Sequence, residues 1–246
     1  MPGNDGYTKL LIHSNTTDGS VTFVDSATAK VITVAGQTHH EIDQYKFGTT
    51  SIYFDGAGDD LNLLDHADWY FAGGDFTIDF WIRFNSLAAS QMLISQYQAA
   101  GERWNLFFDS VLGITFVVRT GAANIVFSQQ GNVIGWAIDT WYHVAVVRNG
   151  DVWRIYRNGT YLVTTSDVDA VPNYTGLLYI GQMGGGTNYF AGYLDEIRIS
   201  KGIARWTNNF SDIPIGIYNK LAKISGYAGS GKICGSTVVA KCNGYG

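Results

Sequence analysis

The sequence predicts an all-β protein in which two antiparallel sheets pack face to face as a sandwich. The clearest sign is the alternation of apolar and polar residues along short runs that turn residues separate. The composition agrees, because charged residues make up only 15% of the chain while glycine occurs 30 times. A soluble domain usually contains about 25% charged residues. Small polar residues and glycine take the place of that charge, which favours strands and turns over helices.

The run from residue 75 to residue 84 shows the strongest alternation. One face collects apolar side chains and the other collects polar or aromatic ones: Phe76, Ile78, Phe80, Ile82 and Phe84 on the first, Asp79, Trp81 and Arg83 on the second. We expect the first face to lie in the core and the second to face water or a ligand.

A second block, residues 141–163, predicts three consecutive antiparallel strands. Asn149-Gly150-Asp151 and Asn158-Gly159 interrupt its alternating runs, and Asn-Gly is a strong hairpin signal because both residues tolerate positive φ. Further strands are expected at residues 10–13, 51–54, 92–96, 105–109, 114–119, 177–181 and 194–200. One short helical turn is expected at residues 202–206.

The length of 246 residues fits one dominant domain, since β-sandwiches reach about 250 residues as a single domain. We assign residues 1–212 to it and residues 213–246 to a short C-terminal extension. This arm is glycine-rich and basic, and we expect it to dock on another subunit: it contains Lys220, Lys223, Lys232 and Lys241 and no acidic residue. Cys234 and Cys242 also lie there, as two free thiols or, alternatively, as a disulfide.

Charge and hydropathy exclude several partners. The net charge of −5 argues against nucleic-acid binding, which needs clustered basic residues. No apolar run reaches the roughly 18 residues of a membrane span, so we expect no membrane insertion. Residues 1–6 lack the basic and apolar regions of a signal peptide, and we expect no cleaved secretion signal.

Six short motifs, in order along the chain, carry a family resemblance. They are Tyr53-Phe54-Asp55-Gly56, the run 76–82, the run 141–148, Tyr156-Arg157-Asn158-Gly159, Tyr179-Ile180-Gly181 and the run 190–199. This succession resembles the laminin-G-like, concanavalin A-like jelly-roll domains. Two further features are similar to the version of this domain common in bacteriophage tail and other virion proteins: Leu10-Leu11-Ile12-His13 with Asp25-Ser26, and Lys46-Phe47-Gly48 before Ser51. The resemblance spans about residues 8–210 and implies two curved antiparallel sheets with a concave face. Family members mostly bind carbohydrate or protein, and some are glycoside hydrolases or lyases, so the fold alone does not decide the function.

A structural calcium ion is one expectation. Calcium prefers several oxygen ligands, and residues 53–60 place carboxylates on a loop bent by glycines. The resemblance adds Asp195, because many members hold calcium with an acid at this position of the last strand. We therefore predict Asp55, Asp60 and Asp195 as ligands, against the alternative that the loop acids only shape a turn.

Carbohydrate binding is the second expectation. Aromatic side chains bind the apolar faces of sugar rings, and a few polar groups fix the hydroxyls. The candidates are tryptophans and their polar neighbours, namely Trp81, Arg83, Trp104, Asn105 and Trp153. The alternative is that these tryptophans are buried in the core, as tryptophan often is.

Catalysis is not expected. A glycosidase needs two opposed carboxylates, and the chain lacks the Glu-x-Asp-x-Glu strand of hydrolases with this fold. Asp75 and Asp79 would lie about 13 Å apart along a strand, which is too far for a retaining pair. We expect His143 to be a hydrogen-bonded structural histidine.

The preferred interpretation is a non-catalytic recognition module, exposed on a phage tail or capsid, that binds cell-surface carbohydrate as a homo-oligomer among other virion subunits. One alternative is a purely structural virion subunit that assembles through the C-terminal arm. A second alternative is a polysaccharide-cleaving enzyme. An extracellular bacterial adhesin would show the same motifs.

Overall fold

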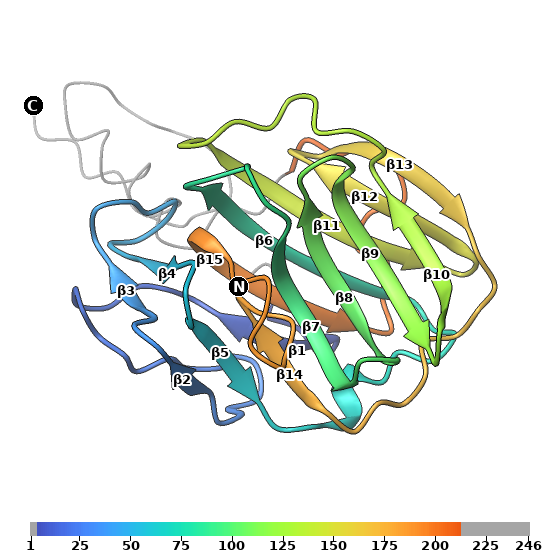
Figure 1. Ribbon diagram of the computed structural model, residues 1–246, viewed down its shortest axis with the longest axis horizontal. Helices are drawn as coiled ribbons and strands as arrows, with labels where there is room; N and C mark the ends of the chain where they lie inside the picture. The colour runs from blue at the N-terminus through green and yellow to red at the C-terminus, as the bar shows by residue number, and fades with distance from the viewer. Residues whose placement is uncertain (1–3, 213–246) are drawn as a thin grey trace, which may run out of the picture.

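The computed structural model describes residues 4–212, which form two antiparallel sheets packed face to face (Figure 1). Sheet A contains, in spatial order, β13 (Thr160–Ser166), β12 (Val152–Arg157), β11 (Trp141–Asn149), β6 (Phe76–Phe84), β15 (Ala191–Lys201), β4 (Ser51–Asp55) and β3 (His39–Glu41), and β1 (Thr8–Ile12) also pairs with β15. Sheet B contains β10 (Ala123–Gln129), β9 (Gly113–Thr120), β8 (Glu102–Asp109), β7 (Gln91–Ala99), β14 (Leu177–Ile180), β5 (Asp60–Leu63) and β2 (Thr33–Ala35). The predicted all-β jelly-roll sandwich is confirmed.

The predicted hairpins are confirmed as well. β11 pairs with β12 and β12 pairs with β13, both antiparallel. Asn158 and Gly159, which connect the second pair, have φ of 50° and 79°. These angles are the ones that a tight hairpin turn requires.

Aromatic residues from both sheets fill the centre of the sandwich. Trp104 of β8 and Trp153 of β12 are completely buried, and both rings lie against Phe116 of β9, at centroid distances of 5.8 and 5.5 Å. Phe76 of β6 also packs across the sandwich, 5.9 Å from Phe116. Core packing of this kind is the main stabilising contribution in a sandwich.

The outer face of sheet A carries a buried charged cluster. Arg198 donates to both carboxylate oxygens of Asp79, at 2.8 and 2.9 Å, and His143 Nε2 lies 3.2 Å from Asp79 Oδ2. Burial alone would raise the pKa of Asp79, but Arg198 and His143 hold it below its usual value. His143 is thus the hydrogen-bonded structural histidine that the sequence predicts.

The segment from residue 202 to residue 210 lies across this face and covers the cluster. Trp206 and Phe210 stack on each other at 4.2 Å, and their rings lie 5.6 and 6.0 Å from that of His143. The segment has no regular secondary structure, so the helical turn expected at residues 202–206 is wrong: its backbone and side chains bond to the sheet instead, as in the 2.8 Å bond from Phe210 N to Gly159 O.

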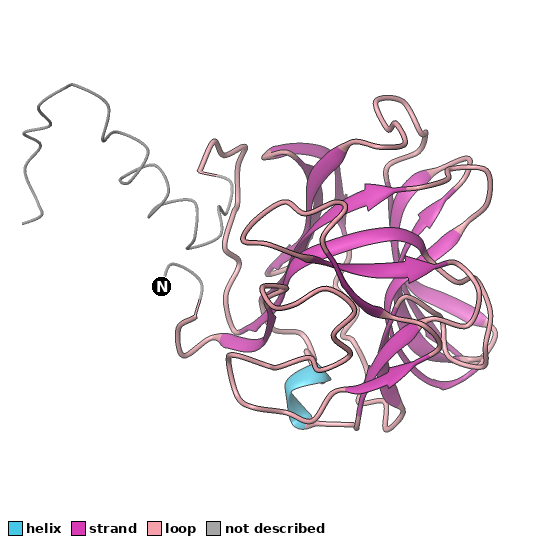
Figure 2. Cartoon of the chain, turned by 90° about the vertical axis from the view of Figure 1, so that its left-hand side faces the viewer, coloured by secondary structure: helices cyan, strands magenta, loops and turns pink. Residues whose placement is uncertain are grey.

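Helix is confined in the described chain to one 3₁₀ turn, Ala67–Trp69 (Figure 2, cyan). Among residues 4–212 there is accordingly no helix long and apolar enough to cross a membrane. The predicted C-terminal arm, with Cys234 and Cys242, lies outside the described residues.

The burial of Trp104 predicts a stability effect. Trp104→Ala should lower the free energy of unfolding by about 3–5 kcal/mol, because it removes a buried ring and leaves a cavity. Trp141→Ala is the matched control: Trp141 is half-buried on the outer face of sheet A, and its loss should cost about 1 kcal/mol or less. Urea unfolding measures both, and equal stability of Trp104→Ala and the unmodified protein would contradict the core assignment.

Candidate functional site

The outer face of sheet B, called here the front face, is the side of the sandwich nearest the viewer in Figure 1. On β8 the core takes Trp104, Leu106 and Phe108, so the intervening residues point away from the core onto this face. Phe127 of β10 is 41% exposed there. The front face is therefore a surface built on rigid, hydrogen-bonded strands.

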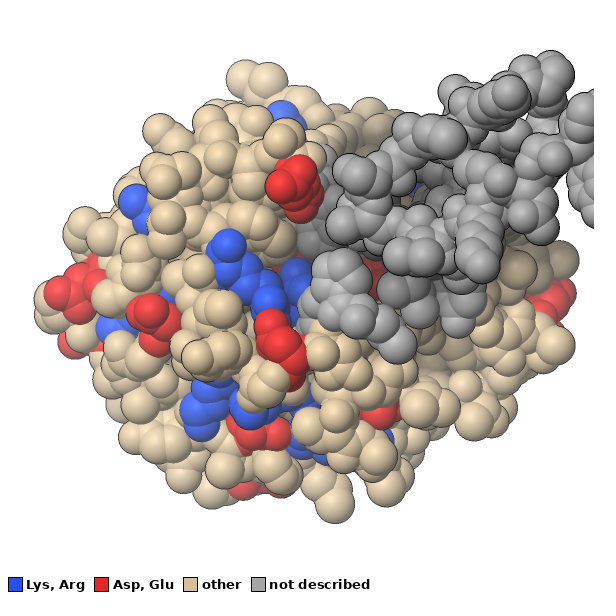
Figure 3. Space-filling model, turned by 180° about the vertical axis from the view of Figure 1, so that it is seen from behind, with Lys and Arg blue, Asp and Glu red and all other residues tan. Residues whose placement is uncertain are grey.

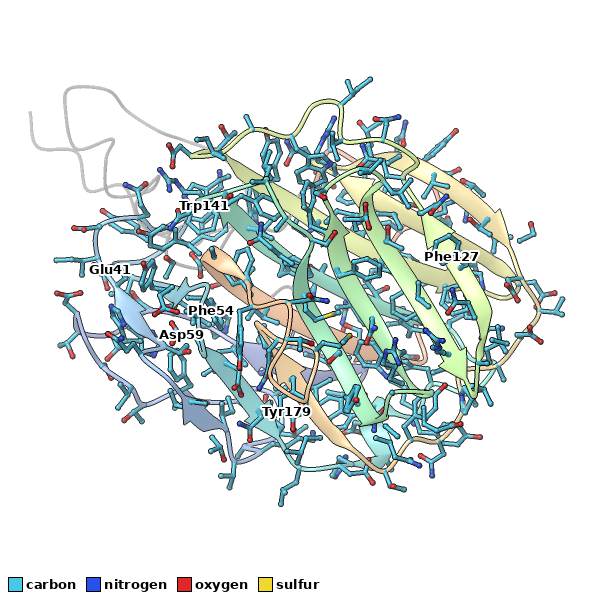
Figure 4. All side chains as sticks on the ribbon, viewed as in Figure 1. Glu41, Phe54, Asp59, Phe127, Trp141 and Tyr179 are labelled. Carbon is cyan, nitrogen blue, oxygen red and sulfur yellow. The ribbon has the colours of Figure 1, made fainter. Side chains whose placement is uncertain are left out.

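One row of side chains runs straight across the front face. The strand registers place opposite one another, in order, Asn62, Tyr179, Ser95, Asn105, Val117 and Phe127. Figure 4 shows Tyr179 on β14 and Phe127 on β10, toward opposite ends of this row. The middle of the row consists of short side chains, whereas large rings stand near its ends.

A second row lies alongside, two residues further along β7 and β8. It consists of Leu177, Tyr97, Arg103, Arg119 and Asn124. Arg103 and Arg119 face each other on neighbouring strands, and both are half-buried. Burial lowers the pKa of Arg103, and the positive charge of Arg119 lowers it further. Arg103 thus lies between Tyr97 and Arg119 in this row.

The loop after β14 holds Tyr97 in place. Gly184, Gly185 and Gly186 all have positive φ, between 73° and 76°. A Cβ atom on Gly184 would lie only 2.7 Å from Cβ and Cγ of Tyr97, so the glycine backbone packs directly on this side chain. No local pattern in the sequence predicts this contact, because Gly184 and Tyr97 are far apart in the chain.

An acidic group lies at the other end of the front face. Asp60 accepts hydrogen bonds from Asn62 Nδ2 at 2.9 Å and from Gln182 Nε2 at 2.6 Å. Burial raises its pKa despite these bonds. Burial and the nearby Asp60 also raise the pKa of Tyr179, which therefore keeps its hydroxyl proton at neutral pH. The front face runs from an acidic end, past two tyrosines, to a basic end.

Comparison with known proteins identifies the family. The family model described as the concanavalin A-like lectin/glucanases superfamily, of laminin G type, matches residues 56–205. The chain belongs to this superfamily. No curated protein matches it.

Solved structures with the same fold are similar at low sequence identity. Domain 4 of the extracellular arabinanase AbnA from Geobacillus stearothermophilus, in complex with arabinotriose, has a TM-score of 0.61 and 16% identity, over 80% of this chain and 95% of that domain. The binding domain of botulinum neurotoxin DC in complex with rat synaptotagmin II has a TM-score of 0.63 and 14% identity, over 80% of this chain. The same toxin domain in complex with SialylT has a TM-score of 0.61 and 16% identity. This superfamily member spans about half, 49%, of those toxin domains.

The predicted sugar-binding residues are not brought together in this superfamily member. Trp104 and Trp153 are completely buried between the sheets, so their assignment to a binding surface is wrong. Trp81 and Arg83 lie on the outer face of sheet A, where Lys46 Nζ sits 4.1 Å above the Trp81 ring and Arg83 pairs with Asp139 at 2.9 Å. Asn105 lies on the front face, on the opposite side of the sandwich.

The predicted calcium ligands are separated too. Asp195 points to the outer face of sheet A, where its Oδ2 accepts from the backbone N–H groups of Lys46 and Phe47, whereas Asp60 lies on the front face. Asp55 pairs with Ala191, four residues from Asp195 along β15, or about 13 Å. Within residues 4–212 no group of three His, Cys, Asp or Glu side chains is placed to hold a metal ion. The ligand set predicted from the sequence does not fit calcium.

Sequence reasoning missed Tyr97, Tyr179 and Arg119, and it considered Arg103 only as a polar neighbour of Trp104. The signal was present in the alternation of β8, because neighbours on a strand point in opposite directions. Trp104 and Asn105 could never share a surface, and assigning Trp104 to the core would have moved Arg103 to the same face as Asn105.

The separation of the three acids predicts the effect of a chelator. Treatment with EDTA should change Tm by less than about 2 °C, because no ion held jointly by Asp55, Asp60 and Asp195 is there to be removed. Differential scanning calorimetry with EDTA and with added calcium measures this. A rise of several degrees with calcium would show that the ion binds through other ligands.

Proposed function

We propose that this chain is a non-catalytic carbohydrate-binding module and that the front face binds the sugar chain. One observation carries the proposal: Tyr97 and Tyr179, both half-buried, stand on the adjacent strands β7 and β14 beside the polar residues Asn62 and Asn105. Half-buried tyrosines offer an apolar ring and a hydroxyl at the same place. Protein surfaces that bind sugars use this combination.

The geometry of the sheet suits a chain of sugars. Strands lie about 4.8 Å apart, so successive residues of a row present side chains at intervals close to the length of one sugar ring. The middle of the row is covered, since Ser95 is completely buried and donates to Gln182 O at 3.3 Å, so the sugar chain would contact the half-buried rings of Tyr97 and Tyr179. Because the strands are rigid, little entropy is lost in ordering the site.

The relatives support the same class of ligand. The arabinanase domain was solved with arabinotriose and the toxin binding domain with SialylT. Their identity to this chain is 16% in each case, so the likeness concerns the fold, and the ligand has to be argued from the front face itself.

The carboxylate of the front face supports binding rather than cleavage. Both oxygens of Asp60 already accept hydrogen bonds, from Asn62 and Gln182. A glycosidase needs one free acid and one free base or nucleophile on opposite sides of the scissile bond, about 5–9.5 Å apart. Asp60 in this setting orients Gln182 and Asn62 instead.

The biological setting stays a prediction from the sequence resemblance. We place the module on the surface of a virion, as a homo-oligomer with other virion subunits, with an extracellular bacterial adhesin as the alternative. Several copies would strengthen the attachment, because linked sites multiply a weak single-site affinity.

Tyrosine variants test the proposal. Tyr97→Ala and Tyr179→Ala should each weaken binding to a polysaccharide that the unmodified protein retains by about tenfold, since each removes one ring contact worth roughly 1.4 kcal/mol. The measurement is affinity electrophoresis over a panel of bacterial, algal and plant polysaccharides, together with an assay for released reducing ends. We expect retention without release.

Tyr161→Ala is the matched control. Tyr161 is 48% exposed on β13 of sheet A, away from the front face, and its loss should leave binding unchanged. Thermal melts of all three variants show whether the fold is kept. The proposal is wrong if no polysaccharide is retained, or if both front-face variants bind as well as Tyr161→Ala.

A further inference from the structure

Arg103 and Arg119 form an unusual pair for a protein of this charge. They lie directly opposite each other on β8 and β9, a position in which like charges are destabilising. On sheet A and its covering segment, Arg198 is paired with Asp79 and Arg205 with Asp5. Arg148 and Arg157 of sheet A have no carboxylate partner within residues 4–212, but they donate to backbone carbonyls at 2.8–3.0 Å. Among the described residues, neither Arg103 nor Arg119 takes part in an ion pair.

The contacts that the two side chains do make leave donors free. Arg119 reaches the carbonyls of Gly121 and Ala122 at 3.4 Å each, which is long for a hydrogen bond. When the side-chain amide of Asn105 is oriented so that its nitrogen donates to Trp104 O, its oxygen accepts a hydrogen bond from Arg103 Nε at 3.0 Å. A guanidinium carries five N–H donors in a planar fork that matches a carboxylate or a sulfate. Most of these donors have no acceptor among the contacts just described.

The neighbourhood of the pair indicates which anion it would meet. Tyr97 is the register partner of Arg103 on the next strand, and the loop at Gly184 packs on its side chain. A sugar ring on Tyr97 would therefore bring a charged substituent within reach of Arg103, one strand spacing or about 4.8 Å away. On the opposite side of the sandwich, seen in Figure 3, basic side chains lie next to acidic ones, as Arg83 does to Asp139 and Arg205 to Asp5.

We propose that the sugar chain bound by the front face is anionic, and that Arg103 and Arg119 bind its carboxylate or sulfate groups. This inference rests on the proposed function. It does not follow from overall charge, because a net charge of −5 would repel a polyanion. Binding of an anionic glycan would need this local pair and would relieve the repulsion between the two arginines.

The test uses polysaccharides that differ only in charge. Polygalacturonate is compared with its methyl ester, and dextran sulfate with dextran, so that one arm reports on carboxylates and the other on sulfates. The unmodified protein should bind at least one charged polymer tenfold or more tightly than its neutral counterpart. That preference should fall as NaCl rises from about 0.05 to about 0.5 M.

Variants connect the preference to the pair. Arg119→Gln and Arg103→Gln should abolish the preference, so that the charged polymer binds no more tightly than its neutral counterpart, and Arg119→Lys should keep part of the preference. Arg154→Gln makes the same change of charge on β12 of sheet A and should have no effect. Thermal melts accompany each variant, and the salt dependence of the unmodified protein tests the idea even where a variant fails to fold.

The outcomes separate this inference from the proposed function. Equal binding of charged and neutral polymers, or equal losses in Arg119→Gln and Arg154→Gln, would overturn the anionic ligand and leave carbohydrate binding standing. Failure of the protein to bind any polysaccharide, charged or neutral, would overturn both.

Discussion

The buried ion pair between Asp79 and Arg198 determines how the two sides of this sandwich are used. Both charges lie on the outer face of sheet A, and removing one partner of such a pair typically costs about 3–5 kcal/mol. They need shelter from water to interact strongly, and Trp206 and Phe210 provide it. The outer face of sheet A is therefore largely occupied by contacts that stabilise the fold, and the outer face of sheet B is the one that can bind a ligand.

The front face positions its side chains through the sheet itself. Its side chains are positioned by strand registers rather than by flexible loops, so a ligand meets groups whose spacing is already fixed. The cost of this arrangement is the contact between two like charges, Arg103 and Arg119, within a protein that is otherwise acidic. Functional sites commonly contain such locally unfavourable features, which the rest of the fold stabilises.

The strands could be predicted from the sequence and the site could not, because strands depend on local patterns whereas the site depends on how distant strands pair. Alternation in residues 76–84 and the Asn158-Gly159 turn depend on neighbours in the chain, and both predictions are confirmed. Alternation divides a strand into two faces but does not say which face is inward when both contain large rings, as around Trp104 and Trp153. The meeting of Arg103, Arg119 and Tyr97 depends on the register of three strands, which no local pattern fixes. Asp55 and Asp60 were grouped because they share one loop, and Asp195 was added by resemblance, but the sheets hold the three acids apart.

The pairing of β1 with β15 has a consequence for how the chain folds. Leu10 and Ile12 lie opposite Ile199 and Ile197, so strands from the two ends of the described chain close one sheet. Ordering a loop of that length costs entropy before any contact is gained, and folds dominated by distant pairs form slowly, in milliseconds to seconds. During synthesis sheet A stays incomplete until residue 201 has left the ribosome. Until then the edges of β1, β4 and β6 that pair with β15 are open to other chains, and misassembly can start there.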